Sequence, residues 1–118
     1  MNKMTKVLVS LALVFVAPLS LACDYPPPPK ELPDGATATK EEMLAGVKVI
    51  AAYQADMTEY LACIEADEIV SVQALADDDE EGKKQSKAMF DKKYNAAVDD
   101  QTRTVERFNA EIRAYKAQ

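Results

Sequence analysis

The chain has 118 residues and a formal net charge of −6, and it contains neither histidine nor tryptophan. This length suits one small domain, and the excess of acidic over basic residues argues against binding to nucleic acid or to anionic membrane surfaces. A zinc centre or a nucleophilic triad normally uses histidine, so neither kind of site is expected.

Residues 1–22 have the three zones of a bacterial secretory signal peptide. A positively charged start precedes an uninterrupted apolar run at 7–17, and small side chains at Ser20 and Ala22 occupy the positions that a signal peptidase reads. The apolar run is shorter than the ~20 residues that a membrane-spanning helix needs. We therefore predict a leader that is cleaved after Ala22 and a mature protein in the periplasm.

The mature chain begins with a proline-rich arm at 23–38. The four consecutive prolines at 26–29 favour an extended polyproline II path, and Pro33-Asp34-Gly35 is a turn signal. Two of the 14 basic residues lie in the leader and all 20 acidic residues follow it, so the net charge of residues 23–118 is −8.

A first helix is predicted at about 40–76, within a helical domain at 39–118. Thr39 and Glu42 have the spacing of a capping box, in which each side chain bonds the backbone amide of the other residue. Apolar residues then recur every seven positions, with further members of the same face between them. The repeating residues are Met43, Ile50, Met57 and Ile64, and the intermediate ones are Val47, Tyr53, Tyr60 and Leu61.

An acidic stretch with one glycine predicts a loop at 77–83. Its first six residues match the start of a calcium-binding loop, but the twelfth position would be Ala88, where a bidentate glutamate is needed. A solvated connection is therefore the expectation, and no metal site is predicted.

A second helix is predicted at about 84–116, because seven residues follow a 4-3-4-3-4-3 spacing that places them in one seam. These residues are Tyr94, Val98, Gln101, Val105, Phe108, Ile112 and Tyr115. Two long helices joined by a short loop pack antiparallel. The predicted fold is thus an all-α, coiled-coil-like two-helix hairpin with an extended N-terminal arm.

The two cysteines, Cys23 and Cys63, are predicted to form a disulfide. The helix from Thr39 to Cys63 is about 36 Å long, and the 16 residues from Cys23 to Thr39 reach about 50 Å when extended, so the arm can fold back far enough. The alternative is a lipid anchor on Cys23, which Ala22 favours and Ser20 does not. Only this alternative would attach the protein to a membrane.

No catalytic residue and no cofactor is predicted, and the chain is expected not to be an enzyme. It has no Cys-x-x-Cys pair and no glycine-rich phosphate loop, and nothing singles out a pair of carboxylates in a pocket. The aromatic residues have the helical spacing of packing residues.

Several stretches resemble a group of small exported proteobacterial helical proteins. They are PDGATAT at 33–39, YLAC at 60–63, YNAAVDD at 94–100 and RFNAEIRAYK at 107–116, together with Met43 and Tyr53. The resemblance covers nearly the whole mature chain and implies an exported helical protein. It implies no activity and no catalytic residues.

The sequence therefore favours a non-enzymatic protein of the cell envelope that binds another protein or has a structural role. The alternatives are a periplasmic holdase for unfolded envelope proteins and a lipid-tethered envelope component. The chain is expected to be a monomer or a homodimer.

Overall fold

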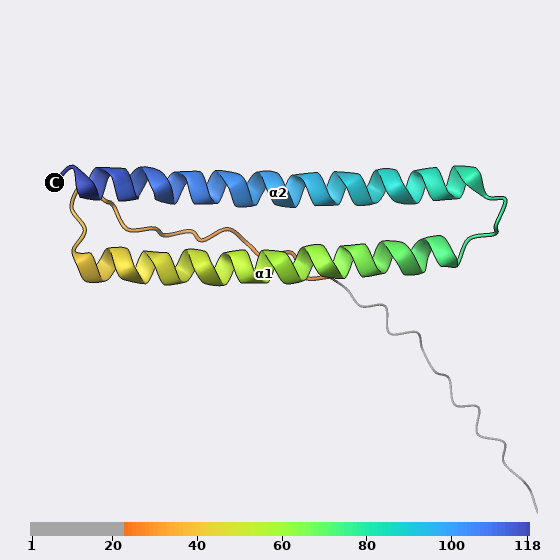
Figure 1. Ribbon diagram of the computed structural model, residues 1–118, viewed down its shortest axis with the longest axis horizontal. Coiled ribbons are helices and arrows are strands. Elements are labelled where there is room, and N and C mark those ends of the chain that lie inside the picture. Colours follow the sequence, from red (N-terminus) through yellow and green to blue (C-terminus); the bar gives the residue numbers. More distant parts are fainter. Residues whose placement is uncertain (1–22) are drawn as a thin grey trace, which may run out of the picture.

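The computed structural model of the protein describes residues 23–118, so the predicted leader and its cleavage site lie outside the described residues. Helix α1 runs from Lys40 to Gln73 and helix α2 from Glu80 to Lys116. The helices lie side by side and antiparallel, and the arm runs back from the start of α1 along the pair (Figure 1). This is the predicted all-α hairpin with an extended arm.

The capping box sets the start of α1. The Glu42 amide donates to Thr39 Oγ1 at 3.2 Å, and the Thr39 amide donates to Glu42 Oε2 at 2.7 Å. Glu41 and Glu42 also place negative charge at the positive end of the helix dipole. Both effects stabilise the first turn, where backbone amides lack helical partners.

The buried stripe of α1 follows a 3-4 spacing, and its members are Met43, Gly46, Ile50, Tyr53, Met57, Tyr60 and Ile64. The prediction that Val47 belongs to this face is wrong, because Val47 is 48% exposed and Gly46 takes the buried position. A Cβ atom on Gly46 would lie 2.7 Å from Phe108 Cε2 and 2.9 Å from Pro33 Cγ. The missing side chain therefore lets α2 and the arm approach α1 at this point.

The connection between the helices lies earlier in the chain than predicted, at 74–79 instead of 77–83, because α1 ends at Gln73 rather than 76 and α2 begins at Glu80 rather than 84. Asp79 caps α2, and its Oδ1 accepts from the Gly82 amide at 2.9 Å. Acidic residues are unfavourable at the negative C-terminal end of the α1 dipole, but they are favourable at the positive N-terminal end of the α2 dipole. The acidic stretch thus fills the end of the connection with Asp77 and Asp78, caps α2 with Asp79, and forms its first turn with Glu80 and Glu81.

The most buried side of α2 does not coincide with the predicted seam but lies beside it. Of the seven seam residues only Phe108 is buried, and the other six are half-buried. The other buried residues of α2 are Ala97 and Thr104. They lie within one turn of Asp100, which bonds the arm through Tyr25, so this side of α2 packs under the arm.

Two apolar clusters form the core, one toward each end of the arm. The cluster beside Cys23 and Cys63 contains Tyr53, Met57, Tyr60, Ile64 and Ala97, and the one beside the turn contains Ala38, Met43, Ile50 and Phe108. Because a single hairpin has little interior volume, few side chains are completely buried. Met57 has an exposed fraction of 0%.

Met57→Ala is expected to lower the free energy of unfolding by about 2–5 kcal/mol, since it leaves a cavity in the cluster beside the disulfide. Met89 is 56% exposed on α2, so Met89→Ala is the matched control and is expected to change stability by less than about 0.5 kcal/mol. Urea denaturation followed by circular dichroism measures both. Equal losses for the two variants would contradict this description of the core.

Candidate functional site

The disulfide between Cys23 and Cys63 fixes the far end of the arm to the middle of α1. The S–S bond length is 2.00 Å and the Cα atoms are 5.7 Å apart. The pairing is compatible with an oxidising compartment outside the cytoplasm. Because the same sulfur would carry a lipid, a disulfide at Cys23 and a lipid anchor there exclude each other.

Next to the disulfide, Tyr25 joins the arm to both helices. Its hydroxyl donates to Asp100 Oδ2 on α2 at 2.5 Å. Its ring meets the ring of Tyr60 on α1 edge to face, with centroids 5.0 Å apart. Pro26 is buried beside it and Pro29 is half-buried, whereas Pro27 and Pro28 are exposed, so the proline run lies on the helices with one side packed.

At its other end, the arm is held by backbone contacts around Gly35. The Gly35 amide donates to Glu111 Oε2 at 2.7 Å, and its carbonyl accepts from Gln118 Nε2 at 2.6 Å. A Cβ atom on Gly35 would lie 1.8 Å from the Glu111 carbonyl oxygen, so only glycine fits. The roles of Glu111 and Gln118 were not predicted, because both are polar side chains near the end of a helix and carry no pattern in the sequence.

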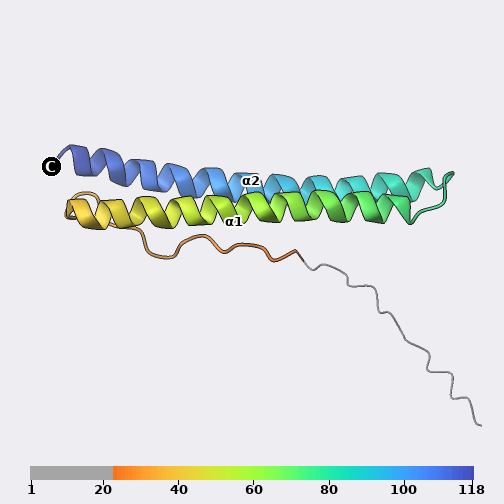
Figure 2. The ribbon, with the colours of Figure 1, turned by 60° about the horizontal axis from the view of Figure 1, so that its bottom comes forward.

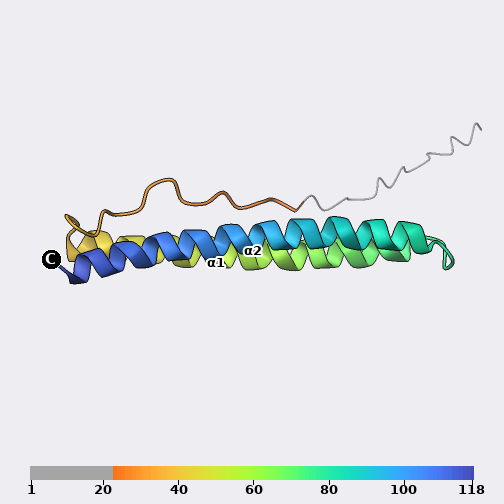
Figure 3. The same cartoon turned by 90° about the horizontal axis from the view of Figure 1, so that it is seen from above.

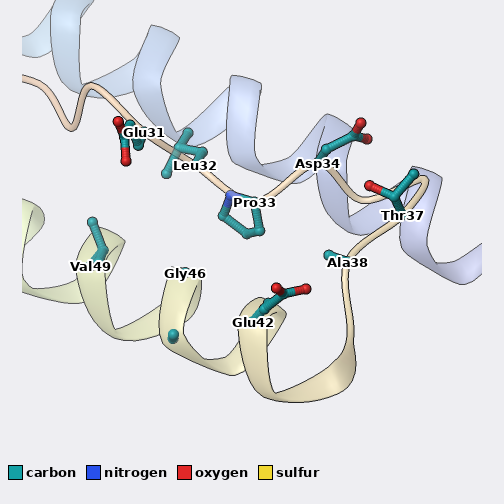
Figure 4. A pocket seen from close by; sticks show the side chains of 10 residues that line it. Glu31, Leu32, Pro33, Asp34, Thr37, Ala38, Glu42, Gly46 and Val49 are labelled. Atoms are coloured by element: carbon teal, nitrogen blue, oxygen red, sulfur yellow. The ribbon is translucent and has the colours of Figure 1, made fainter.

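Where the arm crosses α1 there is a hollow of about 410 Å³. Its lining includes Leu32, Pro33 and the carboxylates of Glu31, Asp34 and Glu42 (Figure 4). Two of these carboxylates already accept backbone hydrogen bonds, Glu42 from Thr39 and Asp34 from Ala36. They therefore stabilise the cap and the turn. Within residues 23–118, no group of three or more potential metal-ligating side chains comes together.

The arm lies on one side of the hairpin only. In Figures 2 and 3 it runs along a single side of the two helices, and its partners on α2, Asp100 and Glu111, belong to that side. The opposite side of the pair is therefore uncovered in the described part of the protein. We call it the open face.

We assign the residues of the open face by helical spacing. They are the positions that lie about a quarter turn or more around each helix from its buried stripe, on the side away from the arm. On α1 they are Val47, Ala51, Gln54, Thr58 and Leu61. On α2 they are Asn95, Val98, Thr102, Val105, Asn109 and Ile112. Leu61, Val98, Val105 and Ile112 are half-buried and the others are exposed.

None of these eleven residues is charged, although 29% of the whole chain is charged. Three members of the predicted seam, Val98, Val105 and Ile112, form the row of this face nearest to the buried residues of α2. The same spacing places Lys40 and Lys116 at one end of the face and Glu65 and Asp91 at the other. Along its outer edge on α2 the face is bordered by a charged row made of Asp99, Glu106 and Arg113. The open face is the candidate functional site.

Neither α1 nor α2 contains a stretch with the length and hydropathy of a membrane span. Comparison with protein-family models, with curated proteins and with solved structures found no match to the chain.

The variant Cys23→Ser/Cys63→Ser is expected to lose about 4 kcal/mol of stability, because the bond closes a loop whose ends are 40 residues apart. Urea denaturation of the oxidised wild-type protein and the variant measures the difference. If the free energy of unfolding falls by less than about 1 kcal/mol, the disulfide is not the main attachment of the arm to α1.

Burial and the hydrogen bond to Asp100 both raise the pKa of Tyr25 above its usual value of about 10. Because the folded protein favours the neutral phenol, this stabilisation is complete below about pH 10 and is lost as the pH rises further. The wild-type free energy of unfolding should therefore fall more steeply above about pH 10 than that of Tyr25→Phe. Parallel pH profiles of the two proteins would contradict this role of Tyr25.

Proposed function

We propose that this chain is a non-enzymatic protein of the cell envelope, exported to the periplasm, that binds a protein partner through the open face. The observation that carries the proposal is an uncharged surface on both helices of a strongly acidic chain. Charged residues are depleted at the centre of protein interfaces, where their desolvation is costly. A solvated helix face would instead be expected to carry charges.

The rest of the described surface supports the proposal. Two of the three carboxylates that line the hollow beside the arm, Asp34 and Glu42, are engaged in turn and capping contacts. The predicted leader and the disulfide both favour export to an oxidising compartment. The disulfide also uses the sulfur that a lipid tether would need, which makes the tethered form the weaker alternative.

The holdase alternative requires a broad apolar surface that accepts many unfolded clients. On the open face, aliphatic side chains such as Val98 and Val105 alternate with Asn95, Thr102 and Asn109. Amide and hydroxyl groups need matching donors and acceptors when they are buried. This alternation favours one specific partner over non-selective capture.

A photo-crosslinking amino acid at position 51, in cells that export the protein, tests the proposal. Ala51 lies on the open face, and its neighbour Ala52 is equally exposed but lies on the arm side of α1, so position 52 is the matched control. We expect one discrete adduct from position 51 and none from position 52. No adduct from position 51 would contradict the proposal, and a smear of many adducts would favour a holdase instead.

A further inference from the structure

We propose that the partner of the open face is a second copy of the same chain, bound face to face so that the two interhelical loops lie at opposite ends of the dimer. This inference rests on the proposed function, because it names the partner of the same surface. In this arrangement α1 packs on α1 of the second copy and α2 on α2, which gives an antiparallel four-helix bundle.

The first argument is the distribution of charge at the two ends of the open face. From the helical rise, Lys40 and Lys116 lie about 20 Å from the centre of the face in one direction, and Glu65 and Asp91 lie about 17–19 Å from it in the other. A two-fold axis that lies in the interface and runs perpendicular to the helices therefore places Lys40 of one copy beside Glu65 of the other. The same rotation brings Lys116 to Asp91 of the second copy.

The other way of stacking the two faces places both loops at the same end. It would bring Glu65 and Asp91 of one copy next to the same acidic residues of the other, and it would place the two acidic stretches at 77–81 side by side. Like charges in contact disfavour an interface. Charge complementarity thus selects the arrangement with opposed loops.

The second argument is that the face can satisfy its own polar groups. The amides of Gln54, Asn95 and Asn109 each carry donors and an acceptor, and the Thr102 hydroxyl can do both. The Thr58 hydroxyl already donates to the Gln54 carbonyl at 2.9 Å and keeps its acceptor sites. Two identical faces therefore present both donors and acceptors to each other, and neither kind is in excess. Each copy has a net charge of −8 over residues 23–118, and an uncharged face is where two such copies meet with least repulsion.

The third argument is area. The open face is about 25 Å long from the helical rise and about 20 Å wide across two helices, which gives about 500 Å² for each copy. Two copies would bury about 1,000 Å² from the uncharged residues alone, which reaches the lower size range of specific interfaces.

Sedimentation equilibrium of the oxidised protein purified from the periplasm tests the inference. We expect a dimer for the wild type, a dimer for Ala52→Glu, and a monomer for Ala51→Glu, which places a charge in the open face. A monomeric wild type at about 100 μM, a concentration at which an interface of this size is expected to form, would overturn the second copy as partner. A dimer that Ala51→Glu leaves intact would overturn the location.

A charge exchange tests the orientation. Glu65→Lys and Lys40→Glu should each weaken the dimer about tenfold, because each turns two symmetry-related attractive pairs into repulsive ones. The double variant Glu65→Lys/Lys40→Glu should recover wild-type affinity. Additive weakening in the double variant would overturn the arrangement with opposed loops.

The mass of the adduct formed from position 51 separates this inference from the proposed function. An adduct with the mass of two copies supports both. A single adduct with a different protein supports the proposed function and overturns the second copy, and the absence of any adduct overturns the two together.

Discussion

The covalent tie between Cys23 and Cys63 is the constraint on which the rest of the structure depends. Two antiparallel helices share a single line of contact, and the small volume between them leaves few side chains out of water. The disulfide holds a third segment against the pair. Because the arm is extended and proline-rich, it loses less conformational entropy on binding than a flexible segment would.

The arm is fixed at both ends, and this explains which residues of the helices are buried. Tyr25 contacts α1 and α2 beside the disulfide, and Gly35 contacts the end of α2 beside the turn. Between these points Pro33 lies against α1 at Gly46. The path of the arm, and not hydrophobicity, therefore decides that this glycine is buried.

This dependence on the arm also decides how much could be predicted from the sequence. Helical periodicity and the Thr39 cap act locally, so the two helices, their antiparallel packing and the start of α1 follow from the residues themselves. The reach of the arm follows from chain dimensions, which is why a Cys23–Cys63 pairing can be derived. The burial of Gly46 and Ala97 and the contacts of Glu111 and Gln118 depend on where a non-helical segment lies in space, and no periodicity encodes that path.

An arm that covers one side of a hairpin makes the two sides chemically different. The covered side gains apolar neighbours from the arm, and its carboxylates are used to hold the arm in place. The open face has no such neighbours in residues 23–118, yet it lacks the charges that keep an exposed helix surface hydrated and non-adhesive. On α2, whose next outward row carries Asp99, Glu106 and Arg113, an uncharged face with complementary charges at its two ends fits the proposed binding surface.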